Sequence, residues 1–140
     1  MAQIIATIDR NKYKTVVTTG NHRLVGDEPT PYGQDLGPSP YDFLLVSIGT
    51  CVAMTLRMYA DRKGWDLQKV AVELDQSRIH AKDCEDCESE EGYIHIIDKR
   101  LKFTGDLSPQ QRQRLLEISE KCPVQKTLTH EIRVKSELII

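Results

Sequence analysis

Apolar and polar residues alternate along much of both ends of the chain, which is the pattern of half-buried β-strands. Turn-forming residues such as Gly20 and Asn21 separate the alternating segments. Six segments show the pattern, at positions 4–8, 12–19, 23–25, 70–80, 93–103 and 131–138. The first three predict a small antiparallel meander. The fourth and fifth, joined by an acidic loop, predict a long hairpin.

A long helix is predicted from Pro40 to about Lys63, after a loop rich in glycine and proline at 26–38. Ser39 is a suitable N-cap, and Asp42 three residues later completes a variant of the capping box. The helix is apolar over more than one face. We therefore expect it to be central and covered by other elements.

Two shorter helices are predicted in the last third of the chain. Ser108 and Gln111 form a second capping signal, which opens a helix to Lys121. Pro123 opens a short helix to about His130. With the strands, this layout predicts an α+β fold in one domain over residues 1–140, with antiparallel sheets around the long helix.

The charge and composition of the chain exclude several classes of function. Charged residues make up 29% of the chain and the net charge is −2, with no dense group of lysines and arginines. We therefore expect neither a nucleic-acid partner nor a membrane-surface role. The longest apolar stretch, 43–48, is too short to span a bilayer, and we see no secretion signal at the N-terminus. These features favour a cytoplasmic location. Nothing in the sequence predicts a cofactor, and Gly33 and Gly37 do not make a phosphate loop.

Two of the four cysteines stand in contrasting surroundings. Cys51 lies inside the apolar long helix, where a cysteine either packs as a small hydrophobe or acts as a thiol that needs charge support. Cys122 directly precedes Pro123 and is expected to cap a helix N-terminus. Free N–H groups stabilise a thiolate there, so local physics predicts Cys122 as the easier thiolate. The alternative is an incidental cap residue.

The other two cysteines, Cys84 and Cys87, form a C-x-x-C motif in the acidic loop. One interpretation is half of a zinc site, with His80 as a third ligand and His95 as a fourth. A second is a dithiol switch, and a third is an exposed pair with no essential role. The acidic neighbours raise the pKa of a thiol but attract a cation.

The residues from Gly37 to Thr55, which include Cys51, resemble the first-cysteine helix of the OsmC/Ohr family of osmotically inducible and organic-hydroperoxide-resistance proteins. The segment from Lys121 to Val124 resembles the second-cysteine signature of that family. The resemblance covers essentially the whole chain. It implies an intertwined homodimer in which two long central helices pack together and the active sites lie at the subunit interface.

The resemblance also implies a two-cysteine reduction of organic hydroperoxides, and thus a thiol peroxidase. Cys51 is then the residue that attacks the peroxide, and Cys122 closes a disulfide that a cellular dithiol reduces. The family supports its thiolate with an arginine paired to a glutamate. Here Tyr41 stands at the glutamate position, which leaves Arg23 and Asp42 as the candidate pair.

Two other functions remain open on the sequence. One is a non-enzymatic redox sensor or zinc protein that uses Cys84 and Cys87. The other is a small-ligand binding module with a pocket beside the long helix. The segment from Arg78 to Glu88 and the presence of Gln125 after the Cys-Pro-Val sequence resemble a less characterised branch of the family, whose members are called redox proteins.

Overall fold

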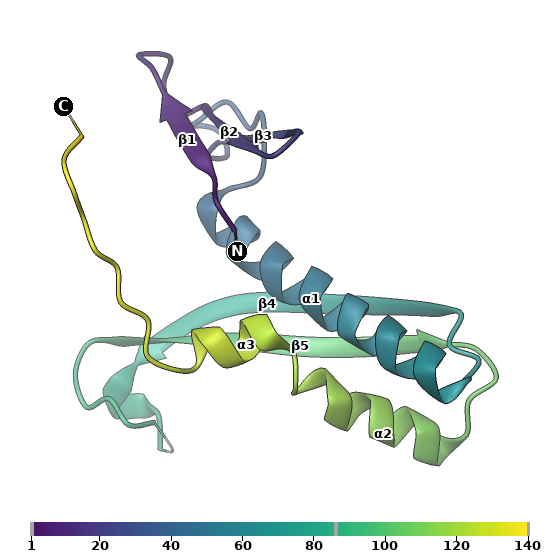
Figure 1. The fold of residues 1–140 in the computed structure, drawn as a ribbon. Helices are drawn as coiled ribbons and strands as arrows, with labels where there is room; N and C mark the ends of the chain where they lie inside the picture. Colours follow the sequence, from purple (N-terminus) through teal and green to yellow (C-terminus); the bar gives the residue numbers. More distant parts are fainter. Residues whose placement is uncertain (1, 86, 140) are drawn as a thin grey trace. The chain divides into compact units, whose positions relative to one another are not determined.

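The computed structural model describes residues 2–85 and 87–139, and the chain forms two compact units. The first unit runs up to Val46 and the second begins at Ser47. Figure 1 shows the elements of both units, and each unit is considered by itself below.

The first unit contains an antiparallel sheet of three strands in the order β1-β2-β3, as the alternating pattern predicts. The strands are β1 (Ile5–Ile8), β2 (Thr15–Thr19) and β3 (His22–Gly26). A loop at 27–38 follows, and the carboxylate of the buried Asp27 holds it together. This carboxylate accepts hydrogen bonds from the Glu28 N–H at 2.7 Å and the Leu36 N–H at 3.2 Å.

Helix α1 (Pro40–Lys63) begins in the first unit and continues through the second, with the bounds predicted from the sequence. The predicted capping box is confirmed. The Ser39 N–H donates to the Asp42 carboxylate at 2.9 Å, and the Asp42 N–H donates to the Ser39 hydroxyl at 3.2 Å. These bonds satisfy N–H groups that the first helical turn leaves without partners.

The second unit is built on the hairpin of β4 (Lys69–His80) and β5 (Tyr93–Thr104), which pair along their full length. A short 3₁₀ turn, η1 (Ala81–Asp83), opens the loop between them. Two helices follow, α2 (Pro109–Ser119) and α3 (Pro123–Leu128), each a little shorter than predicted. Ser108 and Gln111 form the predicted capping box of α2.

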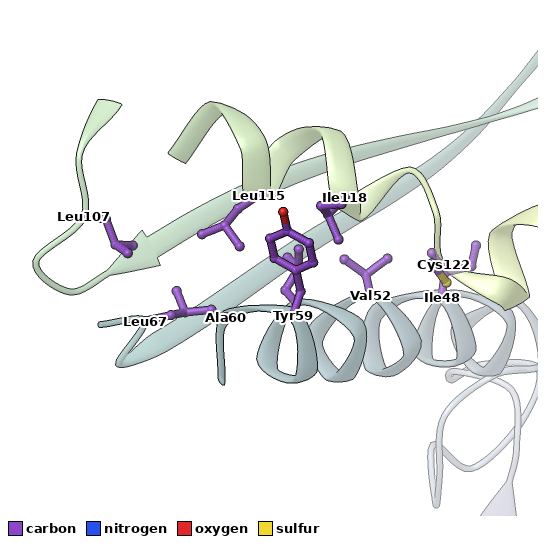
Figure 2. Close-up of a cluster of buried hydrophobic side chains, with 10 residues drawn as sticks. Ile48, Val52, Tyr59, Ala60, Leu67, Leu107, Leu115, Ile118 and Cys122 are labelled. Carbon is purple, nitrogen blue, oxygen red and sulfur yellow. The ribbon is translucent and has the colours of Figure 1, made fainter. Parts of the chain in front are cut away.

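The core of the second unit lies between α1, α2 and one face of the hairpin (Figure 2). Helix α1 contributes Val52 and Leu56, and α2 contributes Leu115, all of them fully buried. Gly49 permits this packing, because a Cβ atom there would approach the Leu74 side chain of β4 to 3.2 Å. By length and composition α1 is also apolar enough to cross a membrane, contrary to the expectation drawn from its longest apolar run. Core helices of soluble proteins pass the same test, and α1 builds this core.

Two expectations from the sequence pattern need correction. The predicted strand at 131–138 is not formed, and residues 131–139 are exposed without regular structure. An alternating segment becomes a strand only by pairing with another strand, and in the described part of this chain residues 131–139 pair with none. Helix α1 is also not covered on every side by its own chain, because Met54 is 70% exposed and Met58 is 63% exposed.

Candidate functional site

The fold brings Cys51 and Cys122 together in the second unit. Cys51 lies on α1 and is half-buried, whereas Cys122 is fully buried at the N-cap of α3 (Figure 2). Both are free thiols, Cys51 packs against the buried cluster that contains Cys122, and it is close enough to raise the pKa of the Cys122 thiol. The arrangement therefore places two thiols from distant parts of the sequence within reach of each other.

The surroundings of Cys122 favour its protonated form. Burial is the largest cause and raises the pKa of the Cys122 thiol, and the neighbouring Cys51 thiol raises it further. The Gln125 N–H donates to the Cys122 sulfur at 3.4 Å and lowers the pKa, as does the Val124 N–H, but these effects are smaller. The prediction that Cys122 is the easier thiolate is therefore wrong, because burial outweighs the helix N-terminus.

A buried lysine holds the junction between α2 and α3 beside Cys122. The Lys99 ammonium of β5 donates to the Ser119 carbonyl at 3.0 Å and to the Gln125 side-chain oxygen at 2.8 Å. It also lies 3.2 Å from the Glu120 carboxylate, while its own side chain is only 11% exposed. The ammonium thus ties together the residues on either side of Cys122.

Glu120 completes this junction. Partial burial pushes the pKa of its carboxyl up, but hydrogen bonds from Gln125 and Lys99 outweigh burial and hold the pKa below its ordinary value. The Gln125 side-chain amide donates to Glu120 at 2.7 Å. Sequence reasoning missed Lys99 and Glu120. A signal existed for Lys99, since it occupies an inward position of β5 opposite Leu74 and between the core residues Ile97 and Leu101.

A cavity of about 280 Å³ lies between α1 and α2 and is lined by residues near Cys51 and Cys122 in the sequence. Thr55, in its wall, donates to the Cys51 carbonyl at 2.8 Å, and Lys121 directly precedes Cys122. The cavity combines apolar and cationic side chains and is lined by Thr55, Met58, Tyr59, Arg62, Arg114, Ile118 and Lys121. We call it the α1–α2 pocket. It is large enough for a small organic molecule.

Tyr59 contributes a phenol hydroxyl to the lining of this pocket. The Arg114 guanidinium donates to its hydroxyl at 3.2 Å, and this hydrogen bond holds the pKa of the Tyr59 phenol below its ordinary value against the opposing effect of burial. The side chains of Arg62, Lys63 and Arg114 all lie within 6 Å of the ring centre. The mouth of the pocket is therefore positively charged, which suits a ligand with electron-rich oxygen atoms.

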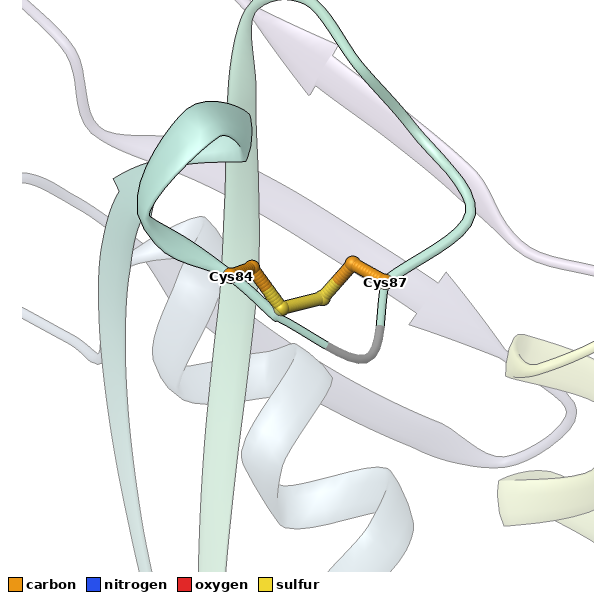
Figure 3. Close-up of a disulfide and its surroundings, with 2 residues drawn as sticks. All are labelled: Cys84 and Cys87. Carbon is orange, nitrogen blue, oxygen red and sulfur yellow. A yellow bond between two sulfur atoms is a disulfide. The ribbon is translucent and has the colours of Figure 1, made fainter.

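Cys84 and Cys87 do not form the zinc site that the sequence left open. They form a disulfide in the loop between β4 and β5 (Figure 3), so neither sulfur is available as a zinc thiolate. The predicted third and fourth ligands have other contacts. His80 lies against the Tyr93 ring with the ring centres 4.5 Å apart, and His95 is hydrogen-bonded to Gln76 at 2.9 Å. Nowhere in residues 2–85 and 87–139 do three potential metal ligands gather.

The predicted supporting residues, Arg23 and Asp42, belong to the first unit, and the paired thiols belong to the second. Arg23 lies on β3 opposite Thr18 and is exposed. Asp42 caps α1 through its contacts with Ser39. Their cooperation with Cys51 stays a prediction.

Comparisons with known proteins place this chain in a family. The model of the OsmC-like protein family matches residues 33–137, which is most of the chain. The protein therefore belongs to the OsmC-like family, as its sequence motifs suggest. No curated protein matches the chain.

Solved structures share the fold at low sequence identity. An OsmC-like protein from Mycoplasma pneumoniae is 18% identical with a TM-score of 0.72, and the match covers 91% of this chain and 86% of that one. The organic hydroperoxide resistance protein OsmC from Legionella pneumophila is 19% identical with a TM-score of 0.66, covering 92% and 89%. The organic hydroperoxide resistance protein OhrB of Bacillus subtilis is 18% identical with a TM-score of 0.61, covering 92% and 90%. These similarities confirm the predicted mixed fold of antiparallel sheets and a long helix.

Proposed function

We propose that this protein reduces organic hydroperoxides with Cys51 as the attacking thiol and Cys122 as the resolving thiol. The observation that carries the proposal is that these two free thiols, which lie far apart in the sequence, come together at one cluster of the core. Membership of the OsmC-like family supports a role in the response to peroxide stress. So do the names of structural neighbours from Legionella pneumophila and Bacillus subtilis.

The assignment of the two roles follows from burial and protonation. Cys51 is half-buried, so a peroxide can reach its sulfur, whereas Cys122 is fully buried. Cys122 also holds its proton more tightly than an ordinary thiol, because of its burial and the neighbouring Cys51 thiol. A buried, protonated thiol is a poor first nucleophile, but its S–H can donate a weak hydrogen bond to a neighbouring thiolate.

The proposed reaction on the protein has two steps. The Cys51 thiolate attacks one peroxide oxygen, the O–O bond breaks, and the alkoxide leaves and takes up a proton to become an alcohol. Cys51 is left as a sulfenic acid. The Cys122 sulfur attacks the Cys51 sulfur, a disulfide forms, and the hydroxyl leaves as water with the Cys122 proton. A cellular dithiol returns both cysteines to thiols by exchange.

The α1–α2 pocket is our candidate substrate site. Its walls include the apolar side chains of Met58 and Ile118, and its contact with Thr55 brings it to the turn of α1 that carries Cys51. Apolar walls favour an organic peroxide over hydrogen peroxide. Positive charge from Lys121 and Arg114 would stabilise the oxygen that leaves with negative charge.

Charge support for the Cys51 thiolate is assigned to Arg23, with Asp42 as the carboxylate that orients it. This assignment rests on the family resemblance. Asp42 already accepts the Ser39 N–H at the helix cap, which leaves its second oxygen for such a contact.

We further propose that the protein works as a homodimer in the cytoplasm. The exposed apolar side chains of Met54 and Met58 on α1 are a face that a second copy would cover. The exposed segment 131–139, which contains the predicted strand 131–138, pairs with no strand in the described part of its own chain. Both features fit an intertwined assembly.

The test is steady-state consumption of cumene hydroperoxide with dithiothreitol as the reductant. Cys51→Ser should lower the rate by about a hundredfold or more, because the hydroxyl is not ionised at neutral pH. The double variant Cys84→Ser/Cys87→Ser is the matched control and should retain the wild-type rate. Equal rates for Cys51→Ser and wild type, with both proteins folded by circular dichroism, would contradict the proposal.

A further inference from the structure

The loop between β4 and β5 contains a disulfide that the proposed peroxide chemistry does not use. Cys84 and Cys87 have their Cα atoms 5.5 Å apart and are joined through their sulfurs (Figure 3). Both side chains are half-buried, so a thiol in solution can reach the bond. Their C-x-x-C spacing is typical of pairs that cycle between dithiol and disulfide.

The hairpin does not depend on this disulfide. The β4–β5 ladder extends to the last pair, His80 with Tyr93, and the two rings of that pair are in contact. The Arg78 guanidinium lies 4.4 Å from the centre of the Tyr93 ring. Beyond the ladder, the Ala81 N–H donates to the Gly92 carbonyl at 2.9 Å. A bridge between residues three apart closes a very short loop and adds little constraint to the chain, so its reduction should leave the fold in place.

The charge around the disulfide is strongly negative. Five exposed carboxylates lie in the described part of the loop, from Asp83, Glu85, Glu88, Glu90 and Glu91. Lys82 is the one lysine or arginine within 81–85 and 87–92. A thiolate that approaches the disulfide is therefore repelled, unless the molecule that carries it also has a positive charge.

We propose that the Cys84–Cys87 pair is a second, reversible thiol–disulfide site that selects thiols carrying a positive charge near the sulfur. The thiolate of the donor attacks one cysteine sulfur, the S–S bond breaks, and the other cysteine leaves and takes up a proton. A second donor thiol then attacks the mixed disulfide and releases the first cysteine. Two electrons and two protons pass to the protein, and the donor leaves as its own disulfide.

Wild-type protein can be tested directly, because cleavage by trypsin isolates this pair. The tryptic peptide 83–99 contains Cys84 and Cys87 but neither Cys51 nor Cys122. The protein is incubated with cysteamine, a cationic thiol, or with 3-mercaptopropionate, an anionic thiol. Free thiols are then alkylated, and mass spectrometry of this peptide gives the rate of reduction. Because the readout excludes Cys51 and Cys122, a failure here is separate from a failure of the peroxidase proposal.

The expected result is faster reduction by cysteamine, per thiolate present, and return to the disulfide when cystamine is added. Glu85→Gln/Glu88→Gln should lower the ratio of the two rates by about threefold or more at low salt. Glu131→Gln/Glu137→Gln is the matched control, since it makes the same change in net charge outside the loop, and it should leave the ratio unchanged. Comparing ratios between variants removes the intrinsic difference in nucleophilicity between the two thiols.

Three results would overturn the proposal. The first is a disulfide that neither thiol reduces while the protein remains folded. The second is loss of the circular dichroism spectrum on reduction, which would make the disulfide a structural bridge. The third is an equal fall of the rate ratio in both double variants, which would show that net charge, and not the carboxylates beside the disulfide, sets the preference.

Discussion

Cys51 and Cys122 lie far apart in the sequence and meet in the core, whereas Cys84 and Cys87 lie three residues apart and meet in an exposed loop. The first pair consists of free thiols on two helices, and the second is a disulfide beyond the end of a hairpin. The proximity of the first pair is therefore a product of the tertiary fold. That of the second follows from its position in the sequence.

This difference decides what controls the chemistry of each pair. Around Cys122, burial and the neighbouring Cys51 thiol raise the pKa of the Cys122 thiol. Around Cys84 and Cys87, exposed carboxylates set which molecules approach. Packing changes should thus affect the core pair and spare the loop pair, while surface charge changes should do the reverse. The following predictions test that separation.

The largest expected effect comes from removing the resolving thiol. Cys122→Ser should lower steady-state peroxide consumption by about a hundredfold, because the Cys51 sulfenic acid then has no neighbouring thiol to attack it. The first turnover should survive. Dimedone labelling of Cys51, followed by mass spectrometry, should trap the sulfenic acid in the variant and much less of it in the wild type. Steady turnover at the wild-type rate in Cys122→Ser would separate Cys122 from the mechanism.

A second prediction concerns the buried ammonium beside Cys122. Lys99→Met removes the donor to the Ser119 carbonyl and the Gln125 side chain, so it should destabilise the protein by about 1–3 kcal/mol. The attack of Cys122 on the Cys51 sulfenic acid should also be slower, because the substitution loosens the α2–α3 junction that positions Cys122. Chemical denaturation measures the first effect and the lifetime of the Cys51 sulfenic acid the second.

The control for Lys99→Met is Lys102→Met on the same strand, where the side chain is exposed. It should change the free energy of unfolding by less than about 0.5 kcal/mol. The reduction rate of the loop disulfide should be the same in both variants, read from tryptic peptide 83–99 in Lys102→Met and from peptide 83–100 in Lys99→Met, which has lost the cleavage site after residue 99. If Lys99→Met alone changed the rate at which the Cys84–Cys87 disulfide is reduced, the two cysteine pairs would be coupled through the hairpin.

A smaller effect is expected from removing the loop disulfide. Cys84→Ser/Cys87→Ser should lower the free energy of unfolding by about 2 kcal/mol or less, because the closed loop is short. Thermal unfolding followed by circular dichroism measures the change. The reduced wild type should match the double variant. A loss of more than about 3 kcal/mol would indicate that the hairpin depends on the disulfide.

The parts of the fold that depend on neighbouring residues could be predicted from the sequence. Both capping boxes, Ser39 with Asp42 and Ser108 with Gln111, form as predicted, because each involves residues three apart. The bounds of α1 and the β4–β5 hairpin follow from local periodicity for the same reason. The strand predicted at 131–138 failed because a strand also requires a distant edge to pair with.

The candidate site shows the same division. The sequence identifies Cys51 and Cys122 as a pair through the family resemblance, and the structure places them together. The local argument for an easy Cys122 thiolate was wrong, because it included the α3 N-terminus and omitted the burial that α1 and α2 impose. Lys99 was overlooked since a lysine in an alternating strand is ordinarily exposed.

The smallest predicted effect is a pH dependence that belongs to the core pair alone. The folded protein holds the Cys122 proton more tightly than the unfolded chain does, since burial raises its pKa. As the pH rises through the ordinary thiol range, above about 8.5, the unfolded chain loses this proton first, so the free energy of unfolding falls. Below that range the stabilisation is fully present. Anaerobic urea denaturation at pH 7 and at about 9.5 should show a steeper fall for the wild type than for Cys122→Ala. Cys84→Ser/Cys87→Ser should keep the wild-type slope, because a disulfide does not titrate. Equal slopes for wild type and Cys122→Ala would mean that another group controls stability in this range.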